Sequence, residues 1–71
     1  MANYTQSVKF KKTVWTKNGA KSWLYFHGFK NLKSDDTTNW YNFRQEDPTR
    51  FSRFFTVQPK RGILIIIGVI E

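Results

Sequence analysis

The chain has 71 residues, of which 12 are lysine or arginine and 5 are aspartate or glutamate, so its formal net charge at pH 7 is +7. A chain of this length folds as one small domain over residues 1–71, and such a domain buries only about 60% of the surface that its unfolded form exposes. The sequence contains no cysteine, which excludes a disulfide framework and a thiolate zinc site.

The first residues, MANYTQS, are polar and lack periodicity. They predict a short flexible arm over residues 1–7, or a frayed start to the first strand. The N-terminal segment has no apolar stretch typical of a secretory signal. The longest apolar run, residues 63–70, is far shorter than the roughly 20 residues that cross a bilayer. We therefore expect a soluble intracellular protein without membrane contact, in the cytoplasm or nucleoid, or in a host cell if the protein is viral.

Residues 8–29 predict a β-hairpin, with strands at about 8–16 and 21–29 joined at Asn18-Gly19. A loop with an odd number of residues pairs Trp15 with Trp23, whereas a two-residue loop would turn one strand over. We favour the odd register because it separates an apolar face from a polar one. The apolar face would carry Val8, Phe10, Val14, Leu24 and Phe26. The other face would carry Lys9, Lys11, Trp15, Trp23, Tyr25 and His27. Gly28 would mark a bulge or bend.

A sheet face that bears aromatic rings and cations suits single-stranded nucleic acid. Bases stack on flat rings for roughly 1–3 kcal/mol each, and lysine or arginine neutralises the phosphates. Alternatively, Trp15 and Trp23 form a cross-strand pair that only stabilises the sheet. Lys9 and Lys11 favour the binding interpretation, because a core face would not also carry them.

Residues 30–38, KNLKSDDTT, predict a surface loop, and residues 39–45 predict a third strand. In this strand Tyr41 and Phe43 share one side, which we expect to be buried. Trp40, Asn42 and Arg44 share the other side, where we expect Trp40 and Arg44 to contact a ligand. The opposite choice is nearly as well supported.

The second half begins with Asp47 as a helix N-cap and Pro48 at the first helical position. A short helix over residues 48–54 is favoured, although residues 50–57 also alternate in the manner of a strand. Residues 58–62 predict a turn. Residues 63–70, ILIIIGVI, predict a strand that is buried on both faces, with a kink at Gly68 where a barrel closes.

The expected fold is mainly β, with the order β-β-β-(short α)-β-β. This order resembles the OB-fold, a small five-stranded barrel whose second and third strands bind oligonucleotides. The chain is similar to the small single-stranded-DNA-binding proteins of phages, in which a basic, aromatic hairpin follows a short first strand. It is also similar to cold-shock domains in Val8-Lys9-Phe10 and in Trp23-Leu24-Tyr25-Phe26-His27. The resemblance implies that Trp15, Trp23, Tyr25 and Trp40 are stacking platforms.

The sequence gives little support to catalysis. His27 is the single histidine, and no nucleophile stands near it in a recognisable constellation. Asp35-Asp36 and Glu46-Asp47 could hold Mg²⁺, but such pairs are more often solvated loop residues or caps. There is no P-loop, dinucleotide fingerprint or zinc spacing. We expect no enzyme, no metal site and no cofactor.

The leading hypothesis is a non-catalytic protein that binds single-stranded nucleic acid, with single-stranded DNA favoured. The expected contact residues are Lys9, Lys11, Trp15, Lys17, Lys21, Trp23, Tyr25, His27, Trp40 and Arg44. Further cations that could follow phosphates are Lys30, Lys33, Arg50, Arg53, Lys60 and Arg61. One alternative is a small viral or mobile-element protein that binds and inhibits an acidic host protein. Another is an architectural protein that bends duplex DNA. A homodimer formed through a sheet edge is also expected.

Overall fold

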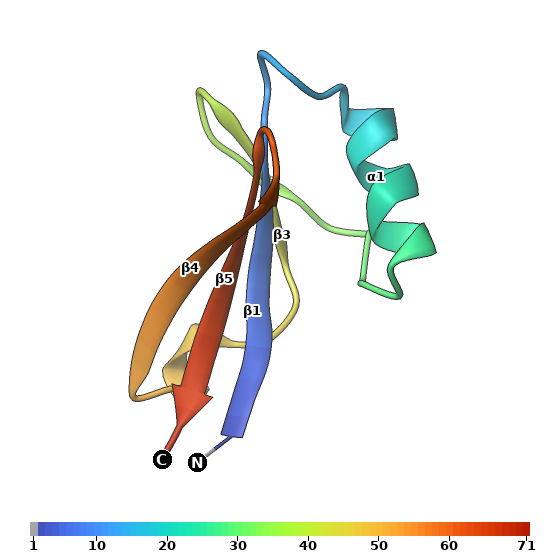
Figure 1. Cartoon of the computed structure of the whole chain (residues 1–71). Helices are drawn as coiled ribbons and strands as arrows, with labels where there is room; N and C mark the ends of the chain where they lie inside the picture. Colours follow the sequence, from blue (N-terminus) through green and yellow to red (C-terminus); the bar gives the residue numbers. More distant parts are fainter. Residues whose placement is uncertain (1) are drawn as a thin grey trace.

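The computed structural model describes residues 2–71, which form one antiparallel sheet and a helix that packs on one side of it (Figure 1). The elements in chain order are β1 (Ala2–Lys11), α1 (Lys17–Phe26), β2 (Asp35–Asp36), β3 (Trp40–Arg44), the 3₁₀ helix η1 (Pro48–Arg50), β4 (Arg53–Lys60) and β5 (Ile63–Ile70). The prediction of a mainly β chain with five strands and a short helix is confirmed. The predicted element order is wrong, because the α-helix lies between the first and second strands.

The strand order in the sheet is β2-β3-β1-β5-β4, so β1 lies at the centre and β2 and β4 form the edges. Val8 in β1 lies opposite Phe43 in β3 and Ile65 in β5. The pairing of β1 with β5 extends to Ala2, opposite Ile70, with an irregularity between Thr5 and Ser7. Residues 2–7 therefore belong to the central strand and are not an arm, whereas Met1 lies outside the described residues.

The predicted hairpin over residues 8–29 is wrong, because its second half is α1. Thr16 caps the helix: its Oγ1 accepts a hydrogen bond from the Gly19 N–H at 3.0 Å. Gly28, with a φ of +76°, follows the helix and donates its N–H to the Tyr25 carbonyl, while Phe29 donates to the Leu24 carbonyl. This is the Schellman arrangement that ends helices at glycine. Asn18-Gly19 thus lies in the first helical turn, and Gly28 is a helix terminator and not a strand bulge.

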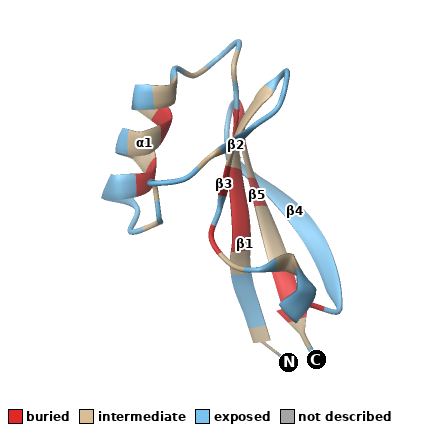
Figure 2. Cartoon of the chain, turned by 180° about the vertical axis from the view of Figure 1, so that it is seen from behind, coloured by how far each residue is buried: buried red, intermediate tan, exposed pale blue. Residues whose placement is uncertain are grey.

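The helix forms because one side of it can be buried against the sheet. Ala20 and Leu24 are fully buried and Trp23 packs beside them, which is the three- and four-residue spacing of a helix face. Figure 2 shows these buried positions on the side of α1 that faces the sheet. Residues 2–71 contain no helix with the length and hydrophobicity that a membrane span requires.

The core lies between α1 and the sheet. Its fully buried sheet residues are Val8, Phe10, Phe43 and Ile63, and Tyr41 packs against them. The predicted inward direction of Tyr41 and Phe43 is therefore confirmed, with Trp40 and Arg44 on the other side of β3.

The capping role of Asp47 is confirmed, since its Oδ1 accepts hydrogen bonds from the Thr49 N–H at 3.0 Å and hydroxyl at 2.9 Å. The helix that follows is only the single turn of η1, so the prediction of a helix over residues 48–54 is too long. The alternative, a strand, is correct from Arg53 onward. The strand predicted at residues 63–70 is confirmed as β5, and a turn at Arg61-Gly62 connects β4 to it.

Replacing Thr16 by alanine should lower the free energy of unfolding by about 1 kcal/mol, because the Gly19 N–H loses its side-chain acceptor. Urea denaturation followed by circular dichroism measures the change. Thr16→Ser keeps the acceptor and should change little, as should Thr13→Ala at an exposed position before the helix. Equal stability of Thr16→Ala and wild type would contradict the cap.

Candidate nucleic-acid interface

The pairing of β1 with β3 brings basic and aromatic side chains together on the face of the sheet opposite α1. Lys9 lies opposite Asn42, Lys11 lies opposite Trp40, and Arg44 lies opposite Ser7. Side chains alternate along a strand, so these residues point away from the core residues Val8, Phe10 and Phe43. We call the face that bears Lys9, Lys11, Trp40, Asn42 and Arg44 the open face.

The open face contains a shallow depression of about 370 Å³. It is lined by Gln6, Ser7, Lys9, Asn42, Arg44, Pro48, Phe54 and Ile66. The lining therefore contributes a lysine and an arginine but no carboxylate, together with the apolar side chains of Phe54 and Ile66. Asp35 of β2 lies opposite Asn42 of β3 and brings one carboxylate to the edge of this face. The depression suits an anionic group that carries a flat or apolar part.

Asn42 is a member of this face that the sequence did not single out as a contact residue. Its Oδ1 atom is buried and has no hydrogen-bond partner. A buried acceptor without a partner costs roughly 1–3 kcal/mol, so a side chain of this kind is unusual in a central position of a sheet. Lys9, which lies opposite Asn42, was predicted as a contact residue from the alternation of faces in the expected hairpin. The pairing of Lys9 with Asn42 instead joins distant parts of the chain.

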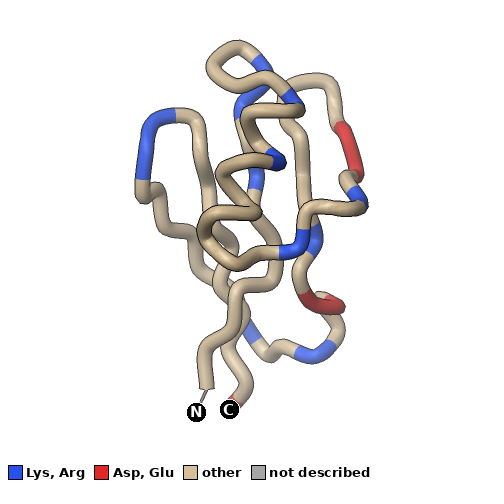
Figure 3. The backbone as a smooth tube through the Cα atoms, turned by 90° about the vertical axis from the view of Figure 1, so that its right-hand side faces the viewer, with Lys and Arg blue, Asp and Glu red and all other residues tan. Residues whose placement is uncertain are grey.

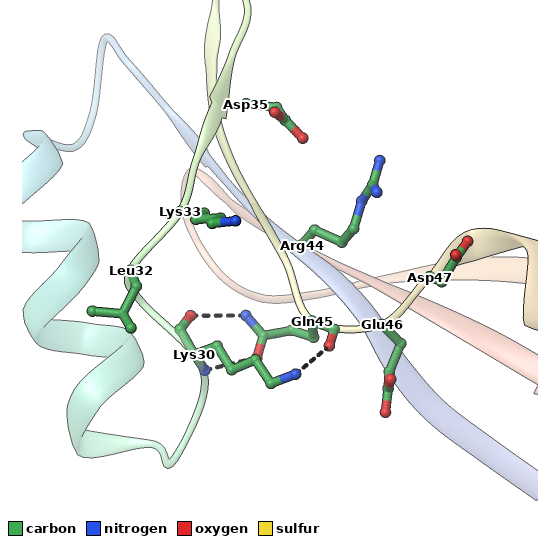
Figure 4. A pocket seen from close by; sticks show the side chains of 8 residues that line it. All are labelled: Lys30, Leu32, Lys33, Asp35, Arg44, Gln45, Glu46 and Asp47. Atoms are coloured by element: carbon green, nitrogen blue, oxygen red, sulfur yellow. Dashed lines mark hydrogen bonds between the residues drawn. The ribbon is translucent and has the colours of Figure 1, made fainter.

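A larger cavity of about 550 Å³ lies beyond β3, next to the loop that follows α1 (Figure 4). Its lining residues are Lys30, Leu32, Lys33, Asp35, Arg44, Gln45, Glu46 and Asp47. The Gln45 side chain accepts from the Lys30 N–H at 2.7 Å and donates to the Lys30 carbonyl at 2.9 Å, which fixes the loop to β3. Three carboxylates and three cations line this cavity, so it is less suited to a phosphate than the open face.

Asp36 and Asp47 are engaged by hydrogen bonds within the protein. Hydrogen bonds from the backbone N–H and the hydroxyl of Thr49 hold the pKa of Asp47 below its usual value. The hydrogen bond from Lys17 is the main cause that lowers the pKa of Asp36, and the two side chains form an ion pair at 2.9 Å. Figure 3 shows the acidic residues in two short stretches and at the C-terminal residue, whereas lysine and arginine are spread over many segments. Within residues 2–71, histidine and acidic side chains nowhere gather in a group of three that could hold a metal ion.

Trp15, a predicted stacking platform, is held against the core. Its Nε1 donates a hydrogen bond to the Arg61 carbonyl at 3.1 Å, which ties the β4–β5 turn to the segment before α1. The ring meets Phe10 edge to face at a centroid distance of 5.5 Å, and Lys60 Nζ lies 5.8 Å from the ring centroid. The predicted pairing of Trp15 with Trp23 across two strands does not form.

Trp23 also packs within the protein. Its ring meets Phe10 edge to face at 5.7 Å, and the His27 and Phe29 rings lie nearly parallel to it at 3.9 and 6.0 Å. His27 lies one helical turn beyond Trp23. The expected hairpin register would have placed His27 opposite Lys11, and this pairing does not form. These contacts favour the alternative interpretation of Trp15 and Trp23, in which both rings stabilise the fold.

The remaining expected contact residues lie on the helix. Lys17 and Lys21 are partly exposed, and Tyr25 is 71% exposed. The ten expected contact residues therefore form two groups on opposite sides of the sheet. The group on the open face is Lys9, Lys11, Trp40 and Arg44. The group on the helix side is Trp15, Lys17, Lys21, Trp23, Tyr25 and His27.

Comparison of the chain with protein-family models, with curated proteins and with solved structures finds no match.

Proposed function

We propose that this protein is a non-catalytic single-stranded nucleic-acid-binding protein, with single-stranded DNA favoured, and that the strand lies across the open face. The observation that carries the proposal is the register of β1 with β3, which sets Lys9, Lys11 and Trp40, with Arg44, on the side of the sheet opposite α1. An OB-like use of a sheet surface is retained in this proposal, but the stacking residues differ from those expected in a hairpin.

The cations would neutralise phosphates, and each of these contacts would release a counterion. Lys11 and Arg44 are exposed, and Lys9 is partly exposed between them along the face. Contacts of this kind give a single strand a salt dependence with a slope of about −0.7 per phosphate. Binding through Lys9, Lys11 and Arg44 would therefore give a slope near −2 by this rule.

Trp40 would supply the stacking platform at the end of β3, directly opposite Lys11. A base on its ring and a phosphate at Lys11 match the alternation of ring and charge along a single strand. Because every base has a face that can stack, this mode of binding would show low sequence specificity. Asn42, between Trp40 and Arg44, would add a polar contact.

Replacing Lys9 and Lys11 by glutamine should weaken binding of a labelled oligothymidine and reduce the magnitude of the salt slope by about 1.4. Trp40→Ala should weaken binding by about 5- to 150-fold, the range expected for the loss of one stacked base. Fluorescence anisotropy at several salt concentrations measures both effects.

The control for charge is Lys21→Gln with Lys33→Gln, which removes the same charge away from the open face and should leave the salt slope nearly unchanged. Duplex DNA and oligouridine competitors test the preference for single strands and for DNA. Equal losses of affinity in the control and in the Lys9/Lys11 variant would show that binding depends only on net charge, which would contradict the proposed face. Undetectable binding at low salt would contradict the function itself.

A second candidate function is supported by the exposed aromatic end of α1. Phe26 is 81% exposed and meets Tyr25 edge to face at 5.5 Å. Aromatic residues are enriched at protein interfaces, and a net charge of +7 suits an acidic partner such as a host protein. Capture of one acidic protein from nuclease-treated lysate, lost in Tyr25→Ala with Phe26→Ala, would favour this second function.

A further inference from the structure

Strand β4 presents apolar side chains from an edge of the sheet. All eight of its residues are exposed, whereas its neighbour β5 contains buried positions (Figure 2). Phe54, Phe55 and Val57 are 45%, 46% and 41% exposed. Because side chains alternate, Phe54 lies on the open face, and Phe55 and Val57 lie on the side of α1. Within the part of the chain that the structure describes, no strand pairs with the outer edge of β4.

Along residues 54–58 this edge lacks the features that usually protect exposed strands, and its one proline, Pro59, lies near the end of the strand. Residues 54–58, FFTVQ, carry no charge, and the charged residues of β4 are confined to its ends, at Arg53 and Lys60. The irregularity in the pairing of β4 with β5 lies toward the end of the strand, between Val57 and Lys60. An uncharged edge that is rich in aromatic and β-branched residues is a template for a further strand.

We propose that β4 pairs in antiparallel orientation with β4 of a second copy of this chain, about a two-fold axis at Thr56. In this register Thr56 faces Thr56 of the partner subunit, and Phe55 faces Val57 of the partner subunit on each side of the axis. Pairs of aromatic and β-branched side chains across strands are stabilising. A contact of this isologous kind closes as a dimer and does not propagate.

The uncharged segment, residues 54–58, is centred on Thr56, which favours this register. An axis at Phe55 would set Arg53 opposite Val57 of the partner subunit, whereas an axis at Thr56 keeps the uncharged segments in contact. Lys60 of the partner subunit would then come near Arg53, whose charge is offset by Glu71 at 2.9 Å. A second copy is the occupant that fits, because the segment is complementary to itself and offers no central cation to an acidic peptide.

The apolar area predicts a weak dimer. With about 200 Å² for a phenylalanine side chain, the exposed parts of Phe54, Phe55 and Val57 amount to about 250 Å² per copy. Stable complexes bury about 1,200–2,000 Å² in total, so this interface lies at the low end even with the edge backbone included. We therefore expect a reversible dimer with a Kd in the micromolar range. Pairing through β4 would also place the open faces of both copies on the same side of one continuous sheet, although the dimer does not depend on the proposed function.

Sedimentation equilibrium of the full chain, at about 0.5 M salt to remove bound nucleic acid, should show a shift from 8.5 kDa toward twice that mass as concentration rises. Phe55→Lys with Val57→Lys should raise the Kd at least about tenfold, because like charges then face each other across the axis. The matched control, Tyr25→Lys with Phe26→Lys, adds the same charges on α1 and should leave the Kd within about twofold. A monomer at all concentrations up to about 500 μM, or equal effects of both variants, would overturn the proposal.

A cysteine at Thr56 provides a second readout that leaves the apolar residues in place. Opposite residues in antiparallel strands have Cα atoms about 4.5–5.5 Å apart, within the range of about 4.4–6.8 Å that a disulfide spans. The chain has no other cysteine, so Thr56→Cys should give a cross-linked dimer on mild oxidation. Thr49→Cys, exposed on η1, should stay monomeric under the same conditions. Failure of Thr56→Cys to cross-link above its level in the Thr49→Cys control would contradict an axis at this residue.

Discussion

Phe10→Ala is expected to lower the free energy of unfolding by about 3–5 kcal/mol, the cost of removing a buried aromatic ring from a packed core. A domain of this size rarely has more than about 3–5 kcal/mol of stability from its core, so the variant should be largely unfolded at 25 °C. The Phe10 side chain is 0% exposed. It meets Trp15, Trp23 and Phe43 edge to face at centroid distances of 5.5, 5.7 and 5.9 Å. Among the described residues, Phe10 is the only aromatic residue of β1 whose ring contacts rings of β3, of α1 and of the segment before the helix.

The measurement is urea denaturation followed by circular dichroism, with Phe26→Ala as the matched control. Phe26 undergoes the same chemical change at a site that is 81% exposed, and its loss should cost no more than about 0.5 kcal/mol. Phe10→Leu keeps most of the apolar volume and should remain folded, with a loss of about 1–1.5 kcal/mol. Similar stabilities of Phe10→Ala and Phe26→Ala would show that the core does not lie between α1 and the sheet.

Gly68→Ala should destabilise the protein by about 1–3 kcal/mol, although alanine is ordinarily tolerated in a strand. A methyl group at this position would overlap with the Phe51 ring, which packs on the glycine backbone. Phe51 is buried and also contacts Tyr4 and Phe54, so its ring has little room to move. Gly68, which was predicted as a kink, thus leaves the space in which the Phe51 ring packs against the backbone of β5.

A double-mutant cycle with Phe51→Ala tests this cause. If the clash is responsible, Gly68→Ala should cost little in the Phe51→Ala background, and the two substitutions should show a coupling of about 1 kcal/mol or more. Additive losses would instead indicate that alanine disturbs the pairing of β5 with its neighbours. Thermal or urea unfolding of the four proteins measures the coupling.

Some elements follow directly from local sequence. The run at Ile63–Ile70 is apolar and β-branched at nearly every position, and no short polar alternative competes with a buried strand. Asp47 before Pro48 defines a helical turn, because the carboxylate can accept the first free N–H and proline needs no acceptor. Tyr41 and Phe43 alternate with polar residues, so their burial follows once β3 has one covered face. For β5 and the turn at Asp47-Pro48, neighbouring residues contain the physical reason, whereas the choice of the buried side of β3 also needs the covering helix.

The helical conformation of residues 17–26 depends on tertiary structure. Asn18-Gly19 suits a hairpin turn, but Thr16 and Gly28 are equally good signals for the two ends of a helix. The helix is stable because Ala20 and Leu24 can be buried on β1 and β3, and that surface exists only after the sheet has formed.

The candidate site divides in the same way. The composition led to the prediction that cations and aromatic rings contact a ligand, and Lys9 and Lys11 could be assigned to one side of a strand. The residues next to them in the sheet could not be assigned. Trp40 and Arg44 belong to β3, about 30 residues away in the sequence, and β5 is more distant still. Local sequence determined which side chains alternate on each strand. Only the long-range pairing of β1 with β3 and β5 decided which strands lie together, because hydrogen bonds between distant strands depend on the burial of the whole core and not on neighbouring residues.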